Sequence, residues 1–199
     1  MPRQVQNRVL ELVETALATT LAREACPDWL RRPGREECGE LWPTVQTVYR
    51  DLTDGQNLPD VMPVRERRSI DAIYTDPTGT HRLVEVDESQ HFNPWRARTL
   101  ALYPTDTVTA YDRDAWATRS ANTTRLPGGG FARPCPPLFP EPDGRNLQRA
   151  YRDTLADLLP PLYGYAPTLR IGDHEVLGWL NDDDAPERMR DLLVGKGLG

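Results

Sequence analysis

Residues 82–92 read Arg-Leu-Val-Glu-Val-Asp-Glu-Ser-Gln-His-Phe and combine an apolar strand with a dense group of polar side chains. The aliphatic residues in this stretch do not strictly alternate with polar ones, which is typical of a strand in a sheet covered on both faces. Glu85 and Asp87 interrupt the run. Because side chains two apart in a strand point to the same face, about 6.6 Å from each other along the chain, both carboxylates are predicted to project together from the strand's carboxyl end.

A second strand is predicted just upstream, at residues 69–74, and the turn residues 76–79 separate it from the first by a length that suits a hairpin. An antiparallel hairpin would lay Asp71 beside Glu85. Carboxylates that converge from neighbouring strands form an oxygen-rich site of the kind that Mg²⁺ or Mn²⁺ prefers. The alternative for Asp71 and for Glu88 is an ordinary solvated charge in a loop or at a sheet edge.

The pattern of Asp71, then Glu85-x-Asp87, then Gln90-His91, with a helix after it, resembles the PD-(D/E)xK nuclease superfamily. It is most similar to the branch that contains the very-short-patch-repair endonucleases. The resemblance covers roughly residues 60–112. It implies a restriction-endonuclease-like fold, an α/β protein whose mixed sheet is flanked by helices in an α-β-β-β-α-β core.

The resemblance also implies roles for individual residues. Asp71, Glu85 and Asp87 are the expected metal ligands, with Mg²⁺ or Mn²⁺ as the cofactor and the backbone carbonyl of Val86 as a further ligand. Asp87 is expected either to ligate a second ion or to take the proton of the attacking water. Gln90 is expected to orient the attacking water, and His91 to act as a base or to stabilise the leaving group. The candidate catalytic residues are therefore Asp71, Glu85, Asp87, Gln90 and His91.

One position departs from the family pattern. The family's lysine sits two residues after the acidic residue, where this chain has Asp87, and the only lysine in the chain is Lys196. A carboxylate does not replace the lysine's positive charge, so a second metal ion or an arginine must supply it if the site is active. The alternative function is a catalytically inactive nuclease-fold protein that acts as a nucleic-acid-binding or partner-binding subunit. A plain interaction protein with an incidental Glu-x-Asp is a third interpretation.

The net charge of −6 argues against a nonspecific polyanion binder, but its distribution is uneven. The span 65–133 carries +1 and the remainder −7. A helix is predicted at 94–103, with Asn93 as N-cap and Pro94 at its first position, so that its amino end lies beside the carboxylates. The residues expected to contact nucleic-acid phosphates are Arg67, Arg68, Arg96 and Arg98. The alternative for the two helical arginines is simple solvation.

DNA is the expected partner, and RNA stays open, as does a homodimer or a place in a larger assembly. With 199 residues, the chain fits one nuclease-like core, expected at 1–125, and a proline-rich connection with a helical and hairpin extension, expected at 126–199. The sequence contains no run of eighteen apolar residues and no charged-then-apolar leader, which predicts a cytoplasmic protein without a membrane segment. Three widely spaced cysteines favour free thiols.

Apolar periodicity predicts the remaining elements. Helices are expected at 3–25, 40–52, 112–120, 145–159 and within the last fifteen residues. A short first strand is expected at 61–66, and a strand at 107–111 beside the central strand. A C-terminal hairpin is expected from 168–171 and 175–180 around Gly172-Asp173. Glu11 and Glu14 of the first helix are more typical of a solvated helix face than of metal ligands.

Overall fold

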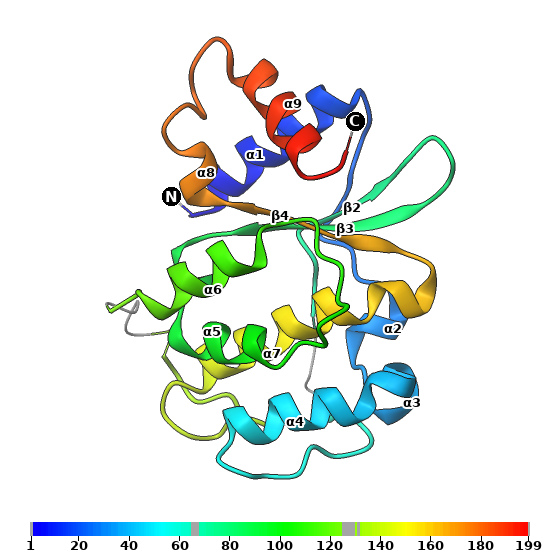
Figure 1. Cartoon of the computed structure of the whole chain (residues 1–199), viewed down its shortest axis with the longest axis vertical. Helices are drawn as coiled ribbons and strands as arrows, with labels where there is room; N and C mark the ends of the chain where they lie inside the picture. Colours follow the sequence, from blue (N-terminus) through cyan, green and yellow to red (C-terminus); the bar gives the residue numbers. More distant parts are fainter. Residues whose placement is uncertain (1, 65–67, 125–129, 131, 199) are drawn as a thin grey trace.

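The computed structural model describes residues 2–64, 68–124, 130 and 132–198. Its centre is a four-stranded mixed sheet in the order β1 (Ala22–Arg23), β2 (Ala72–Thr75), β3 (His81–Asp87) and β4 (Ala166–Gly172). The pairs β1–β2 and β2–β3 are antiparallel, whereas β4 pairs with β3 in parallel. Figure 1 shows helices above and below this sheet, so the chain is an α/β protein with a mixed open sheet flanked by helices.

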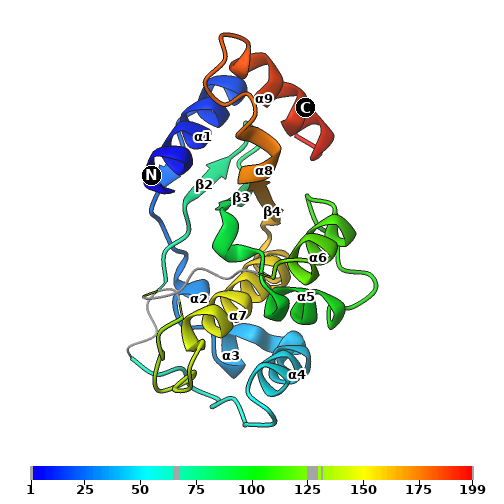
Figure 2. The ribbon, with the colours of Figure 1, turned by 90° about the vertical axis from the view of Figure 1, so that its left-hand side faces the viewer.

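Each face of the sheet has its own helical layer (Figures 1 and 2). One face is covered by α1 (Pro2–Leu17), α8 (Asp173–Val176) and α9 (Ala185–Gly195). The other is covered by α5 (Pro94–Ala101), α6 (Arg113–Ala121) and α7 (Gly144–Leu158). The helix α2 (Asp28–Arg31) also lies on that side, and α3 (Arg35–Cys38) and α4 (Trp42–Leu52) lie farther from the sheet. Short 3₁₀ turns are η1 (Gly39–Leu41), η2 (Ser89–His91) and η4 (Pro160–Tyr163).

Side chains of β3 alternate between the two layers. Val84 and Val86 pack with the apolar residues of α1 and α9, whereas Leu83 packs with those of α4 and α7. Because the side-chain period of a strand is two, Glu85 and Asp87 share the face of Leu83 and project toward α7. The expectation of a strand covered on both faces is confirmed, and the carboxylates lie between the sheet and its most deeply buried helix.

The predicted β2–β3 hairpin is confirmed, although β2 begins two residues after Ile70. Ala72 pairs with Val84 and Thr75 with His81, so the register places Asp71 across from Glu85. The start of α5 is also as predicted, because the Asn93 side chain accepts the backbone N–H of Arg96 at 2.9 Å. These two local features bring the acidic strand ends and the amino end of a helix together.

The first helix is shorter than its apolar periodicity predicts. It ends at Leu17, and Ala18 has a positive φ of 49° that breaks the helical path. The Glu14 carboxylate accepts the backbone N–H of Leu21 at 3.0 Å, which turns the chain back toward the sheet. The residues that follow form β1, the edge strand, in place of the strand expected at 61–66. Within that range, residues 61–64 form no strand, and residues 65 and 66 lie outside the described residues.

Two other predicted strand assignments are wrong. Residues 107–111 contribute only one isolated bridge, between Ala110 and Leu169 of β4, because β4 already occupies the place beside β3. The strand predicted at 168–171 lies within β4, but the second strand, at 175–180, and with it the C-terminal hairpin, are absent from the part of the chain that the structure describes. The Gly172 N–H donates to the Glu175 carboxylate at 2.8 Å, so a helical turn, α8, follows β4 where a β-turn was expected.

The segment 126–199 contributes to the centre of the molecule. Its helix α7 is buried on nearly every side, and its strand β4 pairs directly with β3. The expected hairpin extension is therefore replaced by a strand of the central sheet. Across the described ranges, none of the helices combines the length and the apolar character needed to cross a bilayer.

Candidate functional site

The strand register places Asp71 opposite Glu85 near the carboxyl end of β3, as the sequence predicts. The Asp71 carboxylate accepts the backbone N–H of Val86 at 2.8 Å, which holds it against the strand that carries Glu85. Burial raises the pKa of Asp71 to about 6, and burial together with the negative charge of Asp71 raises the pKa of Glu85 well above its ordinary value. Glu85 is buried and Asp71 is half-buried, and a cation beside them would stabilise the ionised form of both carboxylates.

The first helix reaches this pair through a residue that sequence reasoning missed. Gln6 Nε2 donates to Asp71 Oδ1 at 2.7 Å, so both oxygens of that carboxylate accept a hydrogen bond. Glu11 is exposed, and Glu14 accepts hydrogen bonds from Arg23 and Leu21, so both glutamates are engaged elsewhere, as favoured from the sequence. Gln6 lies in a helix far from Asp71 in the sequence, and this position gave no chemical reason to select it.

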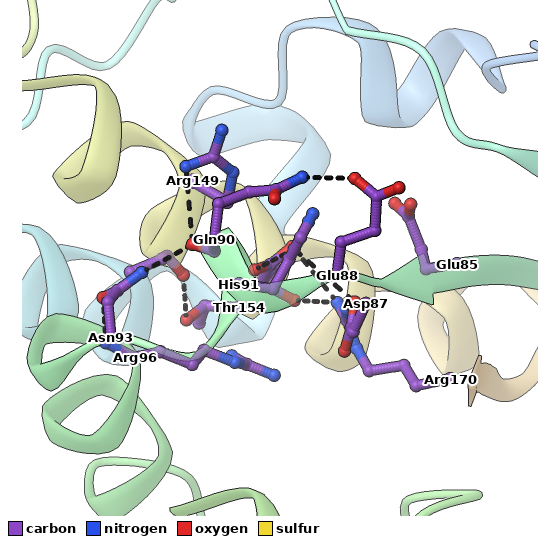
Figure 3. A network of polar contacts seen from close by, with 12 residues as sticks. Glu85, Asp87, Glu88, Gln90, His91, Asn93, Arg96, Arg149, Thr154 and Arg170 are labelled. Carbon is purple, nitrogen blue, oxygen red and sulfur yellow. Dashed lines mark hydrogen bonds and ion pairs between the residues drawn. The ribbon is translucent and has the colours of Figure 1, made fainter. Parts of the chain in front are cut away.

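Asp87 is buried and fully engaged by protein donors. Its Oδ1 accepts from Arg170 Nη1 at 2.7 Å and its Oδ2 from Trp116 Nε1 at 2.8 Å. Figure 3 shows Arg170 directed at this carboxylate from β4. The expected role of Asp87 as a metal ligand stays a prediction, and any bound ion would have to share this carboxylate with a guanidinium.

His91 lies in a cluster with two carboxylates. His91 Nδ1 is 3.0 Å from Asp153 Oδ2 and 3.5 Å from Asp87 Oδ1, and ligand atoms of the three residues lie within 4.8 Å of one another. Burial alone would lower the pKa of His91, but the negative charges of Asp153 and Asp87 raise it. Asp153 was not predicted. It comes from the middle of α7, about sixty positions downstream of His91, and its helix shows only an amphipathic pattern.

Arg170 links this cluster to the core. Its guanidinium donates to Asp87, to Asp157 Oδ1 at 2.7 Å and to the Asp153 carbonyl at 3.1 Å, and its side chain is 0% exposed. Asp157 Oδ2 also accepts hydrogen bonds from Arg96, Tyr103 and Tyr111. Burial opposes ionisation, yet the charges of Arg170 and Arg96 hold the pKa of Asp157 below its ordinary value. Every donor of Arg170 is thus directed at an acceptor within the protein.

Gln90 lies on η2, beside the carboxylate of Glu88. Its Nε2 donates to Glu88 Oε2 at 2.6 Å, and its carbonyl accepts from Arg149 at 3.5 Å (Figure 3). Glu88 is therefore part of the polar network, in contrast to the alternative of a plain solvated charge. The water-orienting role of Gln90 stays a prediction.

The four predicted phosphate-binding arginines have different surroundings. Arg67 lies outside the described residues. Arg68 lies beside Glu85, with Nη2 3.8 Å from Oε1. Arg96 is 1% exposed and bound to Asp157, so its predicted phosphate contact is wrong, because the helix turns this side chain into the core. Arg98 is an exposed residue whose Nε is 3.0 Å from Asp51 Oδ2 on α4.

Among the described residues, Asp87, His91 and Asp153 are the group whose ligand atoms lie within 4.8 Å of one another, and Asp71 and Glu85 lie outside that group. Asp71 and Glu85 supply carboxylate oxygens, and no hydrogen bond to the Glu85 carboxylate forms among residues 2–64, 68–124 and 132–198. Oxygen ligands of this kind suit Mg²⁺ or Mn²⁺. A search of protein-family models, of curated proteins and of solved structures found no match to this chain.

The pH dependence of stability tests the burial of Asp71. Its pKa rises from 3.8 to about 6 on folding, so its contribution to stability is complete below pH 3.8 and is lost as the pH rises through about 6. Asp71→Asn removes this dependence. Between pH 4 and pH 8 in EDTA, the free energy of unfolding should fall by about 2–3 kcal/mol less in the variant than in the parent chain, at roughly 1.4 kcal/mol per pKa unit. Urea denaturation at pH 4, 6 and 8 measures this difference in stability.

Glu11→Gln, on the exposed face of α1, is the matched control for that measurement and should retain the parent profile. Identical profiles for the parent chain and Asp71→Asn would contradict a buried, strained carboxylate at this position.

Proposed function

We propose that this chain is a divalent-metal-dependent nuclease that hydrolyses phosphodiester bonds in DNA. The observation that carries the proposal is the placement of half-buried Asp71 opposite buried Glu85, on paired chain segments at the end of β3. Neighbouring carboxylates of this kind are destabilising unless a cation or a proton lies between them. A structural role alone gives no reason for two adjacent strands to bury such a pair.

The order of elements supports a restriction-endonuclease-like fold. A first helix, three antiparallel strands, a helical crossover and a strand parallel to β3 follow one another, with α2 to α4 inserted after β1. This agrees with the α-β-β-β-α-β core that the motif resemblance implies. The strands that complete the order are β1, which was not predicted, and β4, whose residues 168–171 were predicted as a strand but were assigned to a C-terminal hairpin.

Each side chain has a chemical task in this proposal. Asp71 and Glu85 would hold the ion, with the Val86 carbonyl as the further ligand that the resemblance implies. A bound divalent ion lowers the pKa of its water and neutralises charge that develops on the phosphate. His91, whose pKa is raised by Asp153, is suited to donate a proton to the leaving oxygen more than to act as a base. Asp153 positions this imidazole through Nδ1.

The second candidate is an inactive nuclease-fold protein that binds nucleic acid or a partner. The observation that favours it is Arg170, which lies in the core and neutralises Asp87 and Asp157. The positive charge that the absent lysine would supply is thus present on β4, yet its donors are directed at carboxylates. A metal site reduced to Asp71 and Glu85 would bind an ion more weakly than one that also includes Asp87.

Titration and cleavage assays on the parent chain separate the two candidates. Calorimetry with Mg²⁺ and with Mn²⁺ should detect one saturable binding event that excess EDTA reverses. Single-stranded, duplex and nicked DNA, with matched RNA, should then be cut only when the ion is present. Binding of the ion without cleavage of any substrate would favour the inactive candidate, and no ion binding would refute the nuclease proposal.

A further inference from the structure

An arginine-lined cavity lies next to the acidic pair. It has a volume of about 420 Å³, and its lining residues are Glu24, Cys26, Arg31, Arg32, Val64 and Arg68. Arg68 precedes β2 and forms the wall nearest Glu85, where its Nη2 is 3.8 Å from the carboxylate. The cavity and the acidic pair are therefore neighbours that share one guanidinium.

Arg68 has unused hydrogen-bonding capacity. Its side chain is only 5% exposed, yet Nη1 is buried without any hydrogen-bond partner. A buried donor without an acceptor is destabilising by about 1–3 kcal/mol, and by more when the group is charged. Glu85 forms no hydrogen bond with this guanidinium, because the ion-pair contact is made by Nη2 at 3.8 Å, which exceeds hydrogen-bonding distance. This contrasts with Arg170, whose donors all have acceptors.

The charges of the described lining residues leave the cavity positive. Glu24 is the acidic residue among them, and its Oε1 is 3.6 Å from Arg3 on α1. Arg31 forms an exposed pair with Asp28 at 3.2 Å, whereas Arg32 is exposed and forms no ion pair with another described residue. Surface pairs such as Arg31–Asp28 contribute little, so Arg31 can exchange its partner for an anion.

We propose that Arg68, Arg31 and Arg32 form a subsite for a phosphate group beside the acidic pair. The planar guanidinium fork matches two phosphate oxygens, and charge-assisted hydrogen bonds of this kind are among the strongest in proteins. The assignment of the phosphate to a nucleic-acid strand rests on the proposed function. The affinity for phosphate itself does not, because it requires only the three arginines.

Titration with inorganic phosphate in EDTA tests the subsite without any cleavage. The Nε–Hε resonance of Arg68, identified by its loss in Arg68→Gln, should shift and saturate. Arg68→Gln should bind phosphate roughly 10–100-fold more weakly, as expected for loss of a charged hydrogen bond. Arg68→Lys should recover part of this affinity. Arg31→Gln with Arg32→Gln, both exposed, should weaken binding roughly 3–10-fold without affecting folding.

Arg188→Gln makes the same chemical change on exposed α9 and should leave phosphate affinity unchanged. Glu85→Gln should tighten phosphate binding, because a like charge leaves the subsite, while it weakens divalent-ion binding. Unchanged phosphate affinity in both Arg68→Gln and the double variant would overturn the subsite, whatever the outcome with metal ions. Phosphate binding in a chain that binds no divalent ion would retain the subsite and refute the nuclease proposal.

Two oligonucleotides then identify the source of the phosphate. A single strand with a 5′ phosphate and the same strand without it are titrated against the parent chain and Arg68→Gln. Equal effects of the variant on both strands assign the subsite to a backbone phosphodiester, and an effect confined to the phosphorylated strand assigns it to a terminal phosphate. For a backbone contact, the slope of log affinity against log salt should fall by about one.

Discussion

Arg170→Met is expected to lower the free energy of unfolding by about 3–5 kcal/mol. The change leaves Asp87 and Asp157 buried without their shared cation, and it removes a donor from the Asp153 carbonyl. Methionine matches the length of the arginine stem, so the loss reflects uncompensated charge more than a cavity. Domains of this size are stable by about 5–15 kcal/mol, so the variant should melt at a much lower temperature. Urea denaturation at pH 7 measures the change.

Arg188→Met provides the matched control, because its pair with Asp184 is about half exposed. That variant should change the free energy of unfolding by less than about 1 kcal/mol. Adding Asp157→Asn to Arg170→Met should lower stability by less than the sum of the two single changes, since the second change removes one of the stranded charges. A loss below 1 kcal/mol in Arg170→Met would contradict the buried network.

Glu85→Gln is expected to weaken divalent-ion binding by roughly 100-fold or more, and to lower metal-dependent cleavage by about 10³ or more. Glutamine keeps the size of the side chain but removes the negative charge that attracts the ion. Because burial raises the pKa of Glu85, the variant should remain folded and should be at least as stable as the parent in EDTA at pH 8. Calorimetry, cleavage and thermal melts are the three measurements.

Glu11→Gln again serves as the control, because it makes the same change on the exposed face of the first helix. It should bind the ion and cut like the parent chain. Cleavage that persists in Glu85→Gln at parental rate would remove Glu85 from the metal site and leave the nuclease proposal without its main ligand.

The sequence predicted those elements that depend on residues close together in the chain. The β2–β3 hairpin follows from two apolar runs and a turn, and the start of α5 follows from Asn93 and Pro94. The apolar periodicity likewise predicted α4, α6 and α7. The convergence of Asp71 with Glu85 was accessible because both belong to one hairpin.

The unpredicted features depend on contacts between distant segments. Strand β4 pairs with β3 across about eighty residues, and no local feature distinguishes that pairing from a C-terminal hairpin. Asp153 and Arg170 appear in the sequence as polar interruptions of apolar patterns, so their charges gave no reason to place them in the core. Arg96 was misassigned for the same reason. Only the fold reveals that its helix turns it inward toward Asp157.

The alternation of side chains along β3 means that the same two carboxylates that form the candidate site also influence the register of the strand. A slip of one residue against β2 would rotate the strand and press both acidic groups into the hydrocarbon layer of α1 and α9. Such a misaligned chain would be strongly disfavoured, because the carboxylates of Glu85 and Asp87 would be buried among apolar side chains. The valines of β3 would then face the arginines of α7 and β4. The two acidic residues therefore favour the correct register between β2 and β3. Neutralising them should make the hairpin more tolerant of an inserted turn residue.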